Sequence, residues 1–329
     1  MQEIQNLDLL DRKILVELDQ NSRQPFSIIA KKVRCSRTVV EYRVKKLFER
    51  GIIVSLSAFV DPAKFGLTSW KVYLQFHNKS KEVDKAITDF LQKEEKVWWV
   101  IKCEGNFDLM FSVLAQNVHE FYHFLNYFQS KFSKDESRIE ITTHINPDFF
   151  SRGYLLNKES KKVCSTFLKE PIIEKLDKID LEILQSLIKN SRMPSTEIAT
   201  RLNTTARIVN YRIKELLKKK IITNFRLIPN VNKIGRDYYK VMLQLKDLTK
   251  DKENKLKKYL EVHPNIINLS NTWGPWEIEF EAEIESYKKL TELINQIRNE
   301  FSEIIKKMEF VLIYEEIKAT NDFLNYMKY

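Results

Sequence analysis

The sequence predicts an α+β protein in which one fold occurs twice within a single chain. Its 329 residues are enough for two to four domains of ordinary size. Each copy opens with helical periodicity and continues with alternating strand patterns, which gives the α+β class. Segments recur at a constant offset of 169 residues with no net insertion, which indicates a tandem duplication. Clear examples are Asn21–Arg23 with Asn190–Arg192, Lys71–Phe76 with Lys240–Leu245, and Gly105 with Gly274.

The first fifty residues of each copy predict three short helices. In the first copy Asp8 can cap the first helix, and a second is expected near 27–33. A third should run over 37–49 with Ser36 as its cap, and Gly51 suits a left-handed end. Two helices joined by a tight turn form a helix-turn-helix, so we expect two winged or helix-turn-helix three-helix domains, with the third helix as the reading helix.

The positive charge is concentrated at the start of each copy. The chain carries a net charge of +10, yet residues 54–150 balance to −2 and residues 223–329 to 0. Residues 1–53 hold +4 and residues 172–222 hold +5. A basic segment of this kind is expected where a protein meets nucleic-acid phosphate, and a solvated lysine-rich surface is the plain alternative.

The outward positions of each reading helix carry side chains that can reach base edges and phosphate oxygens. We therefore expect double-stranded DNA as the partner, and a protein-binding three-helix bundle is the alternative. The two faces differ, since Glu41 is replaced by Asn210, so we expect an asymmetric site. Arg43 and its counterpart Arg212 have a second possible role as anchors of the helix. The predicted contacts are Ser36, Arg37, Thr38, Glu41, Tyr42, Arg43, Lys45, Thr205, Arg207, Asn210, Tyr211, Arg212 and Lys214.

The remainder of each copy has the order strand, helix, strand, strand, helix, strand. In the first copy we expect strands at 70–76, 97–103, 109–114 and 139–145, with helices near 82–93 and after residue 118. This order is a ferredoxin-like βαββαβ unit. Such a sheet leaves one face free of helices, and that face is normally buried against a second sheet.

These patterns divide the chain into five parts. We expect a helix-turn-helix domain at 1–53 and a ferredoxin-like domain at 54–150, and the same pair again at 172–222 and 223–329. The linker at 151–171 either docks as a short helix around Val163, Phe167 and Leu168 or acts as a flexible tether.

Composition restricts the location and cofactors of the protein. With 43% hydrophobic and 30% charged residues, the chain is typical of soluble globular proteins. Apolar runs such as Val97–Ile101 are too short to span a bilayer, and the acidic first residues do not suit a signal peptide. Cys35, Cys103 and Cys164 share no metal-ligand spacing and suggest reduced thiols. We expect a cytoplasmic protein with no membrane contact, no metal and no cofactor.

Together the motifs resemble the Lrp/AsnC, or feast/famine, family of transcriptional regulators. Leu7–Leu15 resembles the opening of that family, Ser36–Leu47 its reading helix, and Gly105–Asp108 the turn of its sensing domain. The resemblance covers about residues 4–147 and again 173–316. It implies sheet-to-sheet pairing, here as an intrachain pseudo-dimer and a possible homo-oligomer, and a small effector such as an amino acid. The implied effector residues are Gly105, Asp108, Gly274 and Glu277, whose other role would be purely conformational.

Two enzymatic interpretations compete with a regulator. His119-Glu120-Phe121-Tyr122-His123 matches the zinc-protease pattern, but Phe121 falls on the apolar stripe of the helix and no third ligand is evident. Sirohaem decarboxylases are similar in fold and can occur as fused pairs, with histidines expected around the substrate. The strand at 97–103 has no histidine, and the chain has five in all. We therefore expect a regulator and not an enzyme.

Overall fold

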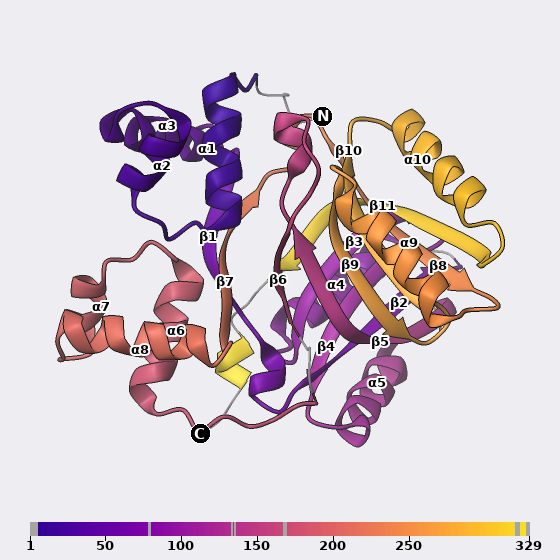
Figure 1. Cartoon of the computed structure of the whole chain (residues 1–329). Coiled ribbons are helices and arrows are strands. Elements are labelled where there is room, and N and C mark those ends of the chain that lie inside the picture. The colour runs from indigo at the N-terminus through magenta and orange to yellow at the C-terminus, as the bar shows by residue number, and fades with distance from the viewer. Residues whose placement is uncertain are drawn as a thin grey trace.

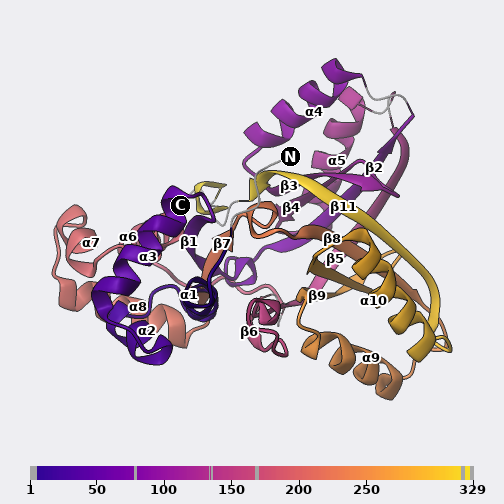
Figure 2. The same ribbon diagram turned by 90° about the horizontal axis from the view of Figure 1, so that it is seen from above.

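The computed structural model describes residues 6–77, 80–132, 134, 136–166, 170–319 and 323–326. Two helical heads lie on one flank, and a β-barrel with helices on its outside forms the other (Figures 1 and 2). The described helices include none that is both long enough and apolar enough to cross a membrane.

The heads contain the predicted helices, and their caps follow from the sequence. Asp8 and Ser36 accept hydrogen bonds from the backbone N–H groups of Asp11 and Val39, so each cap satisfies a donor that the helix itself leaves free. The helices of the first head are α1 (Leu9–Gln20), α2 (Phe26–Val33) and α3 (Arg37–Glu49). Those of the second are α6 (Lys178–Lys189), α7 (Ser195–Arg201) and α8 (Ala206–Lys218).

A two-stranded antiparallel ribbon runs between the heads. It consists of β1 (Ile53–Val60) and β7 (Ile222–Pro229), one strand from each copy. Helix α6 packs on β1 and helix α1 packs on β7, so each head rests on the strand of the other copy. The apolar cores show the same exchange, because Val60 and Phe65 lie in the core of the second head and Leu227 lies in that of the first.

The ends of the two reading helices differ in sequence but share a backbone conformation. Gly51 has φ 66°, as predicted, and Lys220 at the equivalent place has φ 57°. The left-handed region is strained for a lysine, which has a Cβ atom, and is free of strain for glycine. Lys220 therefore forms the turn that ends the second reading helix, as Gly51 does in the first.

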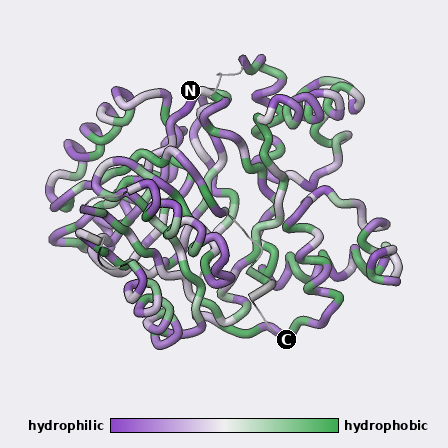
Figure 3. Tube along the Cα trace, turned by 180° about the vertical axis from the view of Figure 1, so that it is seen from behind, coloured by the Kyte–Doolittle hydropathy of each residue, from purple (hydrophilic) through white to green (hydrophobic). Residues whose placement is uncertain are grey.

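Each remaining half folds as a βαββαβ unit, as predicted. Helices pack on the outside of the strands, and their hydropathy alternates along the trace as expected of amphipathic helices (Figure 3). The strands of the first unit are β2 (Thr68–Phe76), β3 (Val97–Gly105), β4 (Leu109–Ala115) and β5 (Glu136–Phe150), with helices α4 (Lys81–Lys93) and α5 (Val118–Phe132). Those of the second are β8 (Asp237–Leu245), β9 (Ile266–Trp273), β10 (Ile278–Ile284) and β11 (Ile305–Ala319), with helices α9 (Lys250–Val262) and α10 (Tyr287–Glu300).

Within the described residues, the eight strands of the two units close into a ring in the order β2-β4-β3-β11-β8-β10-β9-β5. The long last strand of each unit makes the closure. The beginning of β5 pairs with β2 of its own copy, and its later part pairs with β9. Strand β11 pairs in the same way with β8 and then with β3. Buried side chains of both units, such as Tyr73 and Met242, share one cluster inside the ring, so the expected burial of one sheet face against the other is confirmed.

The described part of the linker differs from both alternatives that the sequence suggested. Val163 lies in the short strand β6 (Lys162–Ser165), which pairs with the end of β5, and not in a helix. Phe167 and Leu168 lie outside the described residues. A 3-10 turn, η2 (Gly153–Leu156), packs Tyr154 and Leu155 into the core of the first head. The described part of the linker is thus held in place by strand pairing and apolar burial.

Candidate nucleic-acid interface

The reading helices α3 and α8 present most of the predicted DNA contacts to solvent. Tyr42 is 58% exposed and Tyr211 62%, although both are aromatic and would be buried if their role were packing. Glu41 is half-buried and pairs with Arg37 at 2.7 Å between Oε1 and Nε. The exposed predicted residues are Ser36, Arg37, Thr38, Tyr42, Lys45, Thr205, Arg207, Asn210, Tyr211 and Lys214.

Arg43 and Arg212 also belong to the reading helices, but their side chains meet the first helix of each head. Arg43 Nη1 contacts Asp8 Oδ2 at 2.7 Å and Asp11 Oδ1 at 3.2 Å, and the hydrogen bond to Asp8 raises the pKa of the guanidinium. Arg212 makes the same pair of contacts with Asp177 and Asp180. Each arginine thus ties the reading helix to the start of the first helix of its head. This geometry favours the anchoring role of both arginines over contact with DNA.

A symmetric clamp joins the heads at the repeated Asn-Ser-Arg segment. The hydroxyl oxygens of Ser22 and Ser191, which are equivalent residues, lie 2.7 Å apart, so the pseudo-twofold axis passes between them. Arg23 Nη1 donates to the carbonyl oxygen of Ser191 at 2.5 Å, and Arg192 Nη1 donates to that of Ser22 at 2.6 Å. Together with the ribbon, this clamp fixes the distance and orientation between the two reading helices.

Arg152 of the linker joins the first head to the barrel through a buried ionic network. Its Nη1 lies 2.6 Å from Asp19 Oδ1 on α1, and its Nη2 lies 2.9 Å from Glu283 Oε1 on β10. Arg226 Nη2 on β7 also contacts Asp19 Oδ1, at 2.9 Å. Burial by itself would lower the pKa of Arg152, but the neighbouring Glu283 and Asp19 carboxylates raise it well above its usual value. Arg226 and Arg152 hold the pKa of Asp19 below its usual value against the effect of burial, and the network links three parts of the chain.

The interior of the barrel holds a second set of buried charges. Glu279 Oε2 lies 2.9 Å from Lys71 Nζ and 3.3 Å from Lys240 Nζ, and Glu279 also accepts a hydrogen bond from Tyr73. Lys240 pairs in addition with Glu281 at 2.7 Å. Burial lowers the pKa of Lys71 to about 8, whereas the two lysines hold the pKa of Glu279 well below its usual value against the effect of burial. Two cations and two anions therefore balance within the core.

His144 on β5 lies beside this cluster. Both of its ring nitrogens are buried, and neither has a hydrogen-bond partner among the described residues. Burial and the nearby Lys71 lower the pKa of the imidazole well below its usual value. The histidine is therefore neutral in the folded chain at physiological pH.

The two sensing-domain turns are held by the same hydrogen bonds in both copies. Asp108 Oδ2 accepts from the N–H of Phe76 at 2.8 Å, and Glu277 Oε2 accepts from the N–H of Leu245 at 2.7 Å. A Cβ atom at Gly105 would lie 2.9 Å from the carbonyl oxygen of Phe310, and one at Gly274 would lie 2.5 Å from that of Ile141. These four residues therefore carry the conformational role, since they allow the two copies to approach closely at the barrel seams.

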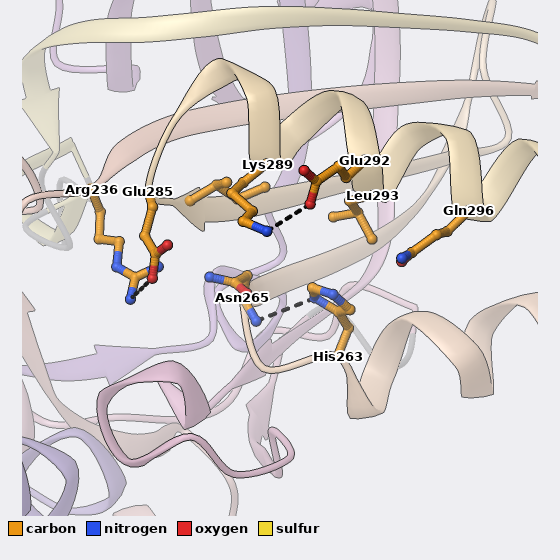
Figure 4. A pocket seen from close by; sticks show the side chains of 9 residues that line it. Arg236, His263, Asn265, Glu285, Lys289, Glu292, Leu293 and Gln296 are labelled. Carbon is orange, nitrogen blue, oxygen red and sulfur yellow. Dashed lines mark hydrogen bonds and ion pairs between the residues drawn. The ribbon is translucent and has the colours of Figure 1, made fainter.

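An open cavity of about 280 Å³ lies in the second copy, between the end of α9 and the first turns of α10 (Figure 4). Arg236 pairs with Glu285 at 3.0 Å, and Lys289 pairs with Glu292 at 2.7 Å. His263 also lines the cavity. The lining thus offers charges of both signs that are already balanced in pairs.

The His-Glu-x-x-His segment lies on the outside of α5. His119 and His123 are exposed, and Glu120 pairs with Lys96 at 2.7 Å. Among the described residues, no group of three or more His, Cys, Asp or Glu side chains is placed to hold a metal ion.

Comparisons with known proteins match both heads. Residues 7–47 match the AsnC-type helix-turn-helix domain, and residues 176–223 match a winged helix-turn-helix DNA-binding domain. A helix-turn-helix transcriptional regulator of uncharacterised role from Pyrococcus abyssi is 31% identical over 160 residues, which cover 44% of this chain and 97% of that relative. The proline dehydrogenase transcriptional activator of Rhodobacter capsulatus is 30% identical over 119 residues, covering 35% of this chain and 75% of that relative.

Solved structures of another protein resemble the tandem as a whole. The siroheme decarboxylase NirDL superposes with a TM-score of 0.64, covering 95% of this chain and 93% of that one, at 12% sequence identity. At this identity the likeness concerns the fold alone, and it shows that a fused pair of such units is a known architecture. The sequence matches, by contrast, cover the heads and nearly the full length of a regulator. This chain belongs to the Lrp/AsnC family of helix-turn-helix transcriptional regulators.

Proposed function

We propose that one chain acts as a complete DNA-binding transcription regulator with two unlike reading helices. The clamp between Ser22, Arg23, Ser191 and Arg192 is the observation that carries this proposal. It holds both reading helices in one fixed arrangement, as a regulator dimer would, so a single molecule can contact two half-sites at once. The exposed basic and polar side chains on α3 and α8 supply the contacts.

The two heads are expected to read different sequences. Arg37 and Arg207 are exposed and occupy neighbouring, non-equivalent positions at the start of the reading helices. Arg37→Ala and Arg207→Ala should each weaken binding by roughly tenfold and alter base preference at opposite ends of the site. Selection of bound sequences from random duplex DNA measures this directly. Identical changes from both variants, or a perfectly palindromic selected site, would contradict the assignment.

Affinity should also fall steeply with salt, because bound lysine and arginine side chains release the counterions of DNA. If the chain binds no duplex DNA in dilute buffer, the proposed function is wrong. A Soret absorption that stays with the protein after incubation with sirohaem and removal of the free tetrapyrrole, together with that failure, would favour the decarboxylase alternative.

The proposal includes a small effector such as an amino acid. Because Asp108 and Glu277 are engaged with backbone amides, the open cavity lined by Arg236, His263, Glu285, Lys289 and Glu292 is the better candidate for its site. A zwitterion can exchange partners with the two ion pairs there and leave no charge unbalanced.

The cavity lies in the second copy, and the position equivalent to Lys289 in the first copy is Glu120, which pairs with Lys96. Calorimetry with each of the twenty amino acids should therefore give at most one site per chain, and that site should be lost in Arg236→Ala. Two equal sites, or binding unchanged in Arg236→Ala, would overturn this part of the proposal.

A further inference from the structure

We propose that Arg23 of the first copy positions Asn210 of the second reading helix, acting through Ser195, and thereby sets the base preference at one half-site. This inference rests on the proposed function. Arg23 Nη2 donates to Ser195 Oγ at 3.2 Å, and Ser195 Oγ donates to Asn210 Oδ1 at 2.7 Å. A residue of one copy thus reaches the reading face of the other through a single hydroxyl group.

The chemistry of the guanidinium gives the direction of the first hydrogen bond, and the placement of the Asn210 amide oxygen gives that of the second. A guanidinium has only donors, so Ser195 Oγ must accept from Arg23. The single proton of the hydroxyl is then available for Asn210, and it is given to the amide oxygen. The NH₂ group of Asn210 is consequently the end that points away from Ser195.

Arg23 is a firm support for this chain of bonds. Its Nη1 donates to the carbonyl oxygens of Ser191 and Met193, at 2.5 Å and 3.0 Å, as part of the clamp. The guanidinium is therefore held at three points. Because the clamp between the heads holds the guanidinium, it keeps one position relative to α8.

Among its described residues, the first head has no equivalent arrangement. The residue that corresponds to Ser195 is Phe26, which has no hydrogen-bonding group, and Arg192 instead stacks on it with its guanidinium carbon 3.6 Å from the ring centroid. Glu41, which corresponds to Asn210, pairs with Arg37 of its own helix. The device is therefore specific to the second reading helix.

We therefore expect Asn210 to contact its base mainly as a hydrogen-bond donor. An asparagine with both ends of its amide free pairs with adenine through two hydrogen bonds. Here Ser195 holds the oxygen, so Asn210 contacts the base through its N–H donors. Guanine offers the two acceptors O6 and N7 and thymine offers O4, whereas adenine offers N7 beside an N6 donor that needs the amide oxygen of Asn210. Arg23 and Ser195 are thus positioning residues, and Asn210 is the residue that contacts the base.

Selection of duplex DNA with the full-length chain tests this assignment. In Ser195→Ala, preference at one position of the second half-site should move from guanine or thymine to adenine by roughly tenfold. Ser195→Thr retains the hydroxyl and should keep the original preference. The first half-site should be unchanged in both variants, and Asn210→Ala should abolish the preference whether or not Ser195 is present.

The control is Thr196→Ala, which removes a neighbouring exposed hydroxyl from the same helix and should leave every preference unchanged. Unchanged preferences in Ser195→Ala, or equal changes in both half-sites, would overturn the inference while leaving DNA binding intact. If the parent chain selects no sequence, the proposed function itself fails.

A second measurement needs no DNA. The side-chain amide resonances of Asn210 in the free protein should shift in Ser195→Ala and not in Thr196→Ala. An unshifted Asn210 amide in Ser195→Ala would also overturn the inference.

Discussion

Replacing Glu279 by glutamine is expected to lower the free energy of unfolding by about 3–5 kcal/mol. The carboxylate is fully buried and lies between Lys71 and Lys240 in the barrel. When the charge of Glu279 is removed, Glu281 is the remaining anionic partner of Lys71 and Lys240. The desolvation of these two buried ammonium groups is then no longer offset. Urea denaturation monitored by tryptophan fluorescence measures the change. In the control Glu292→Gln, which breaks the exposed pair with Lys289, the midpoint should hardly move.

A double variant separates the charge imbalance from a simple loss of packing. Lys71→Met combined with Glu279→Gln removes one charge of each sign and leaves Lys240 paired with Glu281. This double variant should be less destabilised than the sum of the single variants, because a balanced removal of buried charge costs less than an unpaired charge. Strict additivity would show that the charges act independently.

The second large effect is expected at Arg152. Arg152→Met should lower the free energy of unfolding by about 3–5 kcal/mol, because Glu283 and Asp19 both lose a buried cationic partner. Asp19 still has Arg226, whereas Glu283 is left with a hydrogen bond from Tyr154. We therefore expect a larger loss of stability around Glu283 in the barrel than around Asp19 in the first head.

Hydrogen exchange would locate that damage. In Arg152→Met the amides of α1 and β10 should lose protection, while those of α6 in the second head should be much less affected. Arg201→Met, which breaks an exposed pair with Glu197, is the matched control and should change neither stability nor exchange appreciably. Uniform loss of protection throughout the chain would mean that Arg152 does not link these two elements in particular.

Local structure was predictable because its causes lie close together in the sequence. The caps Asp8 and Ser36, the periodicity of α3 and the alternation of β2 all depend on residues a few positions apart. The repeat at an offset of 169 residues then predicted the same elements in the second copy. The exchange of strands between the copies could not be predicted in this way, because the partners β3 and β11, like β5 and β9, are far apart in the sequence.

The functional contacts were harder to predict for a related reason. Asn21–Arg23 marks the duplication in the sequence, and its repetition is also a usable signal for a contact, since a segment kept in both copies can meet itself at a symmetry axis. Glu279 alternates with apolar residues in β10, and such alternation is typical of a strand with one face in water. The same alternation occurs when the polar faces of two sheets point into a closed barrel, so the pattern does not distinguish the two cases. Arg152 lies in the linker, where its burial had no local cause.

During synthesis, the first unit emerges from the ribosome with two strand edges that have no partner yet. Strands β3 and β5 are completed only by β11 and β9, which are translated after the whole second head. At ordinary elongation rates the wait for β11 lasts roughly 10–40 seconds. Open edges of this kind can pair with those of neighbouring nascent chains, so newly made first halves on one polysome are at risk of joining the wrong partner. Prematurely terminated chains should accordingly be prone to aggregation.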